Sequence, residues 1–186
     1  MRELNSHMFQ EVYNNLGINL STLGCVMLDT ELIELAIPKD YLYYSKNQDR
    51  FWIDGLVCDK KAHVTLLYGL LTSAQNLKPH ITKVLDDWLY DTIEIEDIGY
   101  FDSPYKDEDY YCIIAHIKKT DNLLEGHKRL EFLPHINTFS GYRPHLTLCY
   151  IKKDVQIRDN IIKQLKDSLI NKTLKVTNLN LGKSWV

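Results

Sequence analysis

The sequence has no apolar run long enough to cross a membrane. Its longest apolar stretches are about five to seven residues, whereas a membrane-spanning helix needs roughly 20. Residues 1–10 are charged and polar, so they lack the apolar centre of a signal peptide. We therefore expect a cytoplasmic protein that does not enter a membrane.

The chain also lacks a strong charge of either sign. Its 186 residues carry 22 Lys and Arg against 25 Asp and Glu, for a net charge of −3. Proteins that hold long duplex nucleic acid without sequence preference need a basic surface, because their affinity comes from neutralising phosphates. The composition argues against that class and favours a small anionic substrate held by a few groups.

Motifs for metals and common cofactors are missing as well. The four cysteines are widely spaced without a CxxC pair, so we interpret them as reduced core thiols. The sequence has no HxxxH, no GxGxxG and no GKS or GKT loop. We expect no metal and no cofactor. Five histidines stand outside any motif and are interpreted as structural or surface residues: His7, His80, His116, His127 and His135.

What is present is a mixture of helical and strand patterns along the whole chain. Apolar spacing of three and four residues predicts helices, and alternating or short apolar runs predict strands. The predicted helices are 3–16, 73–89, 121–133 and 155–170; the predicted strands are 23–28, 51–57, 63–67, 93–100, 110–117, 145–151 and 174–181, with a loop over 38–50. Composition does not break between the halves, so residues 1–186 are expected to form one α+β domain.

One hexapeptide occurs twice. His63-Val-Thr-Leu-Leu-Tyr68 and His145-Leu-Thr-Leu-Cys-Tyr150 share His, Thr, Leu and Tyr at the same places. Each copy is followed by an amphipathic helix and then a strand, so we expect two similar lobes related by an approximate twofold.

The repeat predicts acid–base chemistry on a phosphodiester. Residues i and i+2 of a strand share a face, so His63 lies beside Thr65 and His145 beside Thr147. Two histidines can act near neutral pH as the base for a nucleophile and the acid for a leaving group. The threonine hydroxyls can donate hydrogen bonds to the non-bridging oxygens. Tyr68 and Tyr150 are expected to face away from the histidines.

The His63-Val-Thr-Leu and Arg143-Pro-His145-Leu-Thr-Leu segments resemble the paired HxT motifs of the two-histidine (2H) phosphoesterase superfamily. The resemblance implies a bilobal α+β fold, with two pseudo-symmetric lobes of antiparallel sheet and flanking helices around a central cleft. It also implies metal-independent catalysis, with His63, Thr65, His145 and Thr147 as the catalytic residues.

Within that superfamily, the size and the Trp near the C-terminus are similar to the phage enzymes that degrade the cyclic oligonucleotide signals of bacterial CBASS immunity. This branch implies that aromatic side chains hold the bases, with Trp185, Tyr41 and Tyr43 as candidates. Trp88 is instead expected in a helix core. Arg143, two residues before His145, is a candidate phosphate contact if the strand extends that far.

Three functions remain open from the sequence. The first is hydrolysis of 3′–5′ bonds in cyclic di- or trinucleotides. In this case the protein would serve viral evasion of immunity in the host cytoplasm. The second is a phosphodiesterase acting on RNA 2′,3′-cyclic phosphates or 2′,5′-linked oligonucleotides. The third is a nucleotide-binding sponge that does not cleave. The near-symmetric motifs do not say which histidine is the acid, and the oligomeric state is not predicted.

Overall fold

The computed structural model describes residues 23–44, 62–137 and 141–183. The strands are β1 (Gly24–Thr30), β2 (His63–Leu70), β3 (Thr92–Asp102), β4 (Tyr110–Ile117), β5 (His145–Lys152) and β6 (Thr173–Lys183); the helices are α2 (Lys78–Val84), α3 (Asp121–Leu130) and α4 (Val155–Leu169), with a short 3₁₀ helix, η2 (Lys39–Tyr41). No helix within these ranges is both long and apolar enough to cross a membrane.

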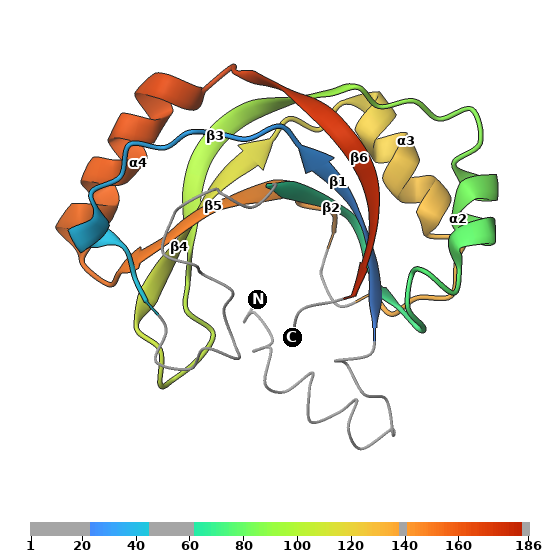
Figure 1. Ribbon diagram of the computed structural model, residues 1–186, viewed down its shortest axis with the longest axis horizontal. Helices are drawn as coiled ribbons and strands as arrows, with labels where there is room; N and C mark the ends of the chain where they lie inside the picture. The colour runs from blue at the N-terminus through green and yellow to red at the C-terminus, as the bar shows by residue number, and fades with distance from the viewer. Residues whose placement is uncertain (1–22, 45–61, 138–140, 184–186) are drawn as a thin grey trace.

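All six strands belong to one antiparallel sheet that closes on itself in the order β1-β2-β5-β4-β3-β6. The closed sheet consists of two three-stranded halves, β6-β1-β2 and β3-β4-β5. The halves meet at Val64 opposite Leu146 and again where the starts of β3 and β6 pair. Figure 1 shows the strands arching between α4 on one side and α2 with α3 on the other. The expected α+β fold with antiparallel sheet and flanking helices is confirmed.

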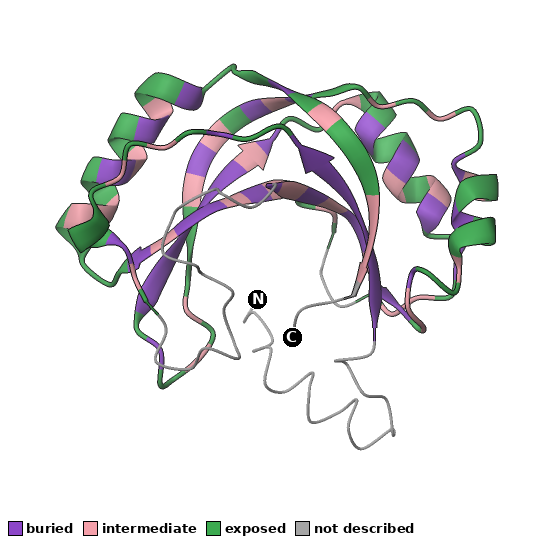
Figure 2. Ribbon diagram, in the orientation of Figure 1, coloured by how far each residue is buried: buried purple, intermediate pink, exposed green. Residues whose placement is uncertain are grey.

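The main hydrophobic core lies on one face of the sheet, which we call the core face. Val64 and Leu146 are fully buried there and pack in one cluster with Leu123 of α3 and Leu165 of α4. Figure 2 shows the buried stripe of each of these helices. Val64 and Leu146 each stand between the His and the Thr of one motif, so both motif pairs must face the other side of the sheet, the motif face.

The helices begin where side chains satisfy their first backbone N–H groups. The Thr120 hydroxyl accepts from the backbone N–H of Leu123 at 3.2 Å, and the Asp154 carboxylate accepts from Gln156 and Ile157 at 2.8 and 3.0 Å. Such caps are worth about 1 kcal/mol each. Both helices therefore start close to their predicted positions and follow β4 and β5 directly.

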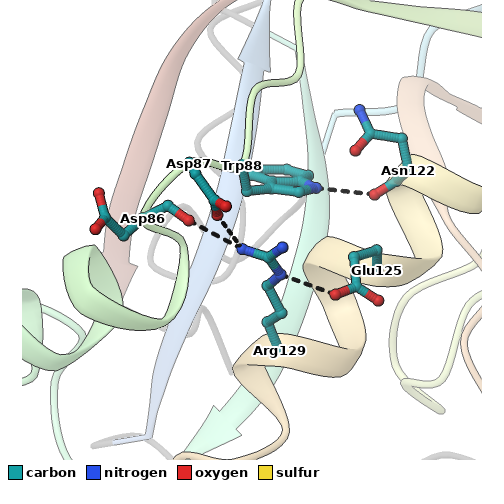
Figure 3. A network of polar contacts seen from close by, with 6 residues as sticks. All are labelled: Asp86, Asp87, Trp88, Asn122, Glu125 and Arg129. Atoms are coloured by element: carbon teal, nitrogen blue, oxygen red, sulfur yellow. Dashed lines mark hydrogen bonds and ion pairs between the residues drawn. The ribbon is translucent and has the colours of Figure 1, made fainter.

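The helix predicted over 73–89 is wrong in extent, because only Lys78–Val84 is helical. The chain leaves the helix through Asp87, whose φ of 64° is left-handed. Trp88 then lies half-buried against Gly126 of α3 and donates its indole N–H to the Asn122 carbonyl at 2.9 Å (Figure 3). Arg129 of α3 reaches the Asp87 carboxylate at 2.7 Å. The apolar residues of 77–88 thus belong partly to the short helix α2 and partly to the segment after it, where Trp88 packs on α3. The predicted helix 3–16 and strand 51–57 lie outside the described residues.

Candidate active site

The two HxT motifs meet across the β2–β5 pairing. Val64 lies directly opposite Leu146 in an antiparallel register. Continuing this register by one residue on either side places His63 opposite Thr147 and Thr65 opposite His145. Directly opposed residues of antiparallel strands point to the same face. The four candidate residues therefore form a square on the motif face, with each histidine facing the threonine of the other strand.

All four side chains are intermediate in burial, between fully buried neighbours. Burial lowers the pKa of both histidines below the usual value, because it disfavours the charged imidazolium. The two rings also interact, since a charge on His145 lowers the pKa of His63. Like-charge repulsion of this kind favours a state with one proton shared between the pair.

His145 is held in one tautomer. Its Nδ1 lies 2.9 Å from the backbone carbonyl of Arg143, which can only accept a hydrogen bond. Nδ1 therefore carries the hydrogen, and in the neutral ring Nε2 has the lone pair. An imidazole whose Nδ1–H is fixed by a carbonyl is suited to proton transfer at Nε2.

The neighbour of His63 on the other side is a buried carboxylate. Asp29 of β1 lies directly opposite His63, and it is 5% exposed. The Asn180 amide of β6 donates to both of its carboxylate oxygens, at 3.0 and 3.2 Å. Burial is the largest influence on the pKa of His63 and lowers it, but the Asp29 charge acts in the opposite direction.

His116, interpreted from the sequence as a structural or surface residue, lies next to this site. It lies directly opposite His145 on β4, on the motif face, and its charge lowers the pKa of His145. Its ring packs over Gly99 of β3, where an added Cβ would lie 2.6 Å from His116 Nε2. No sequence pattern signals this position of His116, because it depends on the β4–β5 register.

Tyr68 and Tyr150 also lie on the motif face, so the prediction that they face away is wrong. In β2, Thr65 and Leu67 pair with two consecutive residues of β1, Met27 and Val26. Leu66 therefore has no partner on β1 and forms a bulge. In β5 the same step from Thr147 to Cys149 makes Leu148 a bulge. A bulge inserts one residue and reverses the alternation beyond it. Both motifs carry the bulge at the same place, at the Leu that follows the motif Thr.

The other predicted contacts are distributed around this square. Arg143 precedes β5, so it is not a strand residue; its backbone carbonyl binds His145, and its exposed side chain lines a hollow of about 460 Å³ beside His116 and Lys119. Tyr43 packs on Tyr110 and donates its hydroxyl to Glu108. Burial and then the Glu108 hydrogen bond raise the pKa of Tyr43 to about 12.

Tyr43 thus joins a second apolar cluster that includes Cys112 of β4. Cys112 Sγ lies 3.9 Å from the Thr147 hydroxyl, so this cluster borders the square of motif residues. Tyr41 is 37% exposed at the end of η2, and no described contact brings it to the square. Trp185 lies outside the described residues.

Phe101 is an aromatic neighbour that the sequence interpretation missed. This β3 side chain is 44% exposed, and its ring meets the His145 ring edge to face, with 5.2 Å between centroids. An exposed aromatic ring can stack on a nucleotide base. Among the residues that the structure describes, no three His, Cys, Asp or Glu side chains gather to hold a metal ion.

Two side chains, Tyr142 and His127, support the contact between β2 and β5, which we call the seam between the two halves of the sheet. The Tyr142 hydroxyl donates to the Thr65 carbonyl at 3.1 Å, and His127 Nδ1 lies 2.6 Å from the Leu66 carbonyl. The Tyr142 and His127 rings stack with their centroids 4.0 Å apart. The described part of β2 and β5 shares only the Val64–Leu146 pair, so these contacts replace hydrogen bonds that a longer ladder would supply.

Comparison with known proteins shows which fold and which family this chain shares. The most similar solved structures include Usb1 of Kluyveromyces marxianus, at 9% identity and a TM-score of 0.51, covering 90% of this chain and 97% of that one. A second Usb1 structure, with uridine monophosphate, has 10% identity, a TM-score of 0.49 and coverage of 90% and 98%. Among curated protein sequences nothing matches. Residues 46–184 match the model of the 2′-5′ RNA ligase superfamily, a family of 2H phosphoesterases, and the chain belongs to this family.

Proposed function

We propose that the protein is a metal-independent phosphodiesterase that hydrolyses the 3′–5′ bonds of cyclic di- or trinucleotides. The observation that carries the proposal is the square of two histidines and two threonines across the Val64–Leu146 pair. Family membership supports a phosphodiesterase activity in general. The cyclic substrate rests on the resemblance to the phage branch and on the small net charge of −3. In that setting the activity would protect a virus from nucleotide-based immunity.

The route begins with the 2′-hydroxyl next to the scissile phosphate. One histidine removes the 2′-hydroxyl proton while the oxygen forms a bond to phosphorus. The bond from phosphorus to the 5′-oxygen breaks, and the other histidine gives its proton to that oxygen. The products are a 2′,3′-cyclic phosphate and a 5′-hydroxyl. Water can then open the cyclic phosphate with the two histidines in exchanged roles.

Thr65 and Thr147 hold the phosphate in this proposal. Negative charge grows on the non-bridging oxygens in the transition state, and hydroxyl donors fixed in place stabilise it. Phe101, Tyr43 and Arg143 border the square and are the described candidates for contacts to bases or to a neighbouring phosphate. Tyr41 and Trp185 remain candidates proposed from the family resemblance alone.

A panel assay in EDTA tests the function. The substrates are 3′,3′-cyclic GMP–AMP, a cyclic trinucleotide, a 2′,5′-oligoadenylate and a short RNA with a 2′,3′-cyclic phosphate. We expect turnover of a cyclic oligonucleotide and a loss of about 10²–10⁴-fold in His63→Ala and in His145→Ala. His80→Ala, at an exposed position on α2, is the matched control and should retain full activity.

Other outcomes would redirect the proposal. The family description itself favours testing 2′-5′ linkages, and turnover of only the 2′,5′-linked or cyclic-phosphate substrates would move the protein to that second activity. Tight binding without cleavage would make it a nucleotide sponge. Cleavage of a 2′-deoxy cyclic dinucleotide would contradict the route through the 2′-hydroxyl, although not the enzyme class.

A further inference from the structure

The two halves of the sheet place different residues at equivalent positions beside the histidines. β2 and β5 correspond to each other through the motif repeat, so their outer neighbours, β1 and β4, correspond as well. The residue opposite His63 on β1 is Asp29, whereas the residue opposite His145 on β4 is His116. The motifs are nearly symmetric, but the side chains next to them are a carboxylate in one half and an imidazole in the other.

The Asp29 side chain is fixed in this position. It is 5% exposed, and Asn180 donates hydrogen bonds to both of its oxygens. Asn178, directly opposite Asp29 on β6, is uncharged. Within the described residues no Lys or Arg forms an ion pair with Asp29, and its charge acts on His63 across the strand pair. A buried carboxylate beside an imidazole favours the protonated ring.

His116 is fixed by different means. Its ring packs over Gly99, where any larger residue would collide with Nε2. Asp97 lies opposite it on β3, but the Asp97 carboxylate is bound by Lys166 of α4 at 2.7 Å. The Lys166 hydrogen bond is the main reason that the pKa of Asp97 lies below its usual range. Much of the Asp97 charge is therefore balanced by Lys166, and His145 is left facing a second imidazole.

We propose that Asp29 and His116 are positioning residues that divide the acid and base roles between the two histidines. Asp29 holds the proton on His63, which becomes the acid for the leaving 5′-oxygen. His116 keeps His145 unprotonated, so that its Nε2 is the base for the 2′-hydroxyl. The assignment of these roles rests on the proposed function, whereas the order in which the two histidines bind protons does not.

The charged groups around each histidine support this order. His63 lies opposite Asp29 of β1 and diagonally across the β2–β5 pairing from His145, and the Asp29 charge raises its pKa against the effect of burial. His145 lies opposite His116 of β4, with His63 as its diagonal neighbour and uncharged Phe101 reaching it from β3. Burial is the largest influence on the pKa of His145 and lowers it; the Arg143 carbonyl raises this pKa, and the His116 charge, the smallest of the three effects, lowers it. Arg143, Lys119 and Glu96 lie farther out around the hollow.

The first test needs no substrate. The full chain is labelled with ¹⁵N-histidine, and the ring signals are followed by NMR against pH, with His63→Ala and His145→Ala to assign them. We expect His63 to bind its proton at higher pH than His145. Asp29→Asn should lower the pKa of His63 and change that of His145 much less. His116→Asn should raise the pKa of His145.

The second test uses the leaving group. A ribonucleoside 3′-(4-nitrophenyl phosphate) releases a stable phenolate, so it needs no acid, whereas a dinucleotide with the same 5′ nucleoside does. His63→Ala should lose about 10²–10⁴-fold on the dinucleotide and far less on the aryl ester. Asp29→Asn should show a smaller loss of activity, again larger on the dinucleotide than on the aryl ester. His145→Ala and His116→Asn should lose equally on both esters.

Further variants separate these roles from structural damage. Asp29→Glu keeps the charge and should restore the wild-type order of proton binding. Gly99→Ala should displace the His116 ring and imitate His116→Asn without removing the imidazole. The proposal is overturned if His145 binds its proton first as pH falls, if Asp29→Asn leaves the His63 pKa unchanged, or if Asp29→Asn loses equally on both esters. If neither ester is cleaved, the proposed function fails, and the NMR order still decides the roles of Asp29 and His116.

Discussion

At the scale of single residues, Thr65 and Thr147 offer the simplest test of how the phosphate is held. Threonine and valine have nearly the same shape, so Thr65→Val and Thr147→Val each remove a hydroxyl with little change in packing. Loss of one such donor is expected to lower kcat by about 10²–10³-fold. Serine at either position keeps the hydroxyl and should retain most activity. The measurement is steady-state kinetics on the best substrate of the panel.

The control for this series is Thr82→Val, which changes an exposed threonine of α2 and should leave kcat unaltered. A loss below about threefold in both motif variants would mean that the hydroxyls do not contact the phosphate. Thr147 also borders the Cys112 thiol. Burial raises the pKa of Cys112 to about 11, so this thiol is expected to stay protonated beside the site.

The motif residues were predictable, but their partners were not. The repeated His-x-Thr spacing is visible in the sequence and needs only the two-residue period of a strand. Asp29 and His116 become partners of the histidines only through cross-strand register. Register depends on tertiary pairing, so no local pattern announces it. The orientation of Tyr68 and Tyr150 was mispredicted for a related reason, since period two fails at a bulge.

At the scale of elements, the contact between β2 and β5 depends on Tyr142. Its hydroxyl donates to the Thr65 carbonyl, and burial raises its pKa well above the usual range. Tyr142→Phe leaves this carbonyl without its donor and should lower the free energy of unfolding by about 1–3 kcal/mol. Urea denaturation measures this, with Tyr44→Phe, 50% exposed, as the matched control.

Activity provides a second measurement for Tyr142→Phe. The Thr65 backbone sits in the seam, so a shift there moves the Thr65 hydroxyl relative to His145. If kcat falls by more than the increase in the unfolded fraction accounts for, the seam positions the site residues. Equal stability of Tyr142→Phe and wild type would contradict the role assigned to this hydrogen bond.

Strand and helix patterns were predicted with different success. The strands at 110–117 and 145–151 and the helix at 155–170 match the structure closely, because caps and strong periodicity mark them. The segment 73–89 was mispredicted because its apolar residues have helical spacing but do not all belong to one helix. Ile81 is the buried residue of α2, whereas Trp88 packs on α3 after a left-handed turn. Tertiary contact overrode the local pattern there.

At the scale of the whole molecule, the buried histidines should make stability depend on pH. Both have pKa values lowered by folding, from about 6.5 in the unfolded chain. Between the folded and unfolded values the unfolded chain binds more protons, so the free energy of unfolding rises with pH and falls as pH decreases through this window. Urea denaturation between pH 8 and pH 5 should show this fall.

Variants identify the groups responsible for this slope. His63→Asn and His145→Asn together should flatten the dependence, whereas His80→Asn should not. Inorganic phosphate should stabilise the wild type more at the lower pH, because an anion binds the protonated pair. A double variant with the wild-type slope would assign the pH dependence to other groups.

The different residues opposite the two histidines, Asp29 and His116, also give the site a direction under the proposed acid and base roles. A nucleotide strand is itself directional, with a 2′-hydroxyl on one side of each phosphate and a 5′-oxygen on the other. With proton donor and acceptor on opposite halves of the sheet, only one orientation of the strand can react. A linear dinucleotide bound the wrong way round would block the site without being cleaved. A ring of uniform 3′–5′ linkages presents the same sense at every phosphate once it is seated with the correct face. Under the proposed function, each rotation of such a ring in the site would therefore be productive.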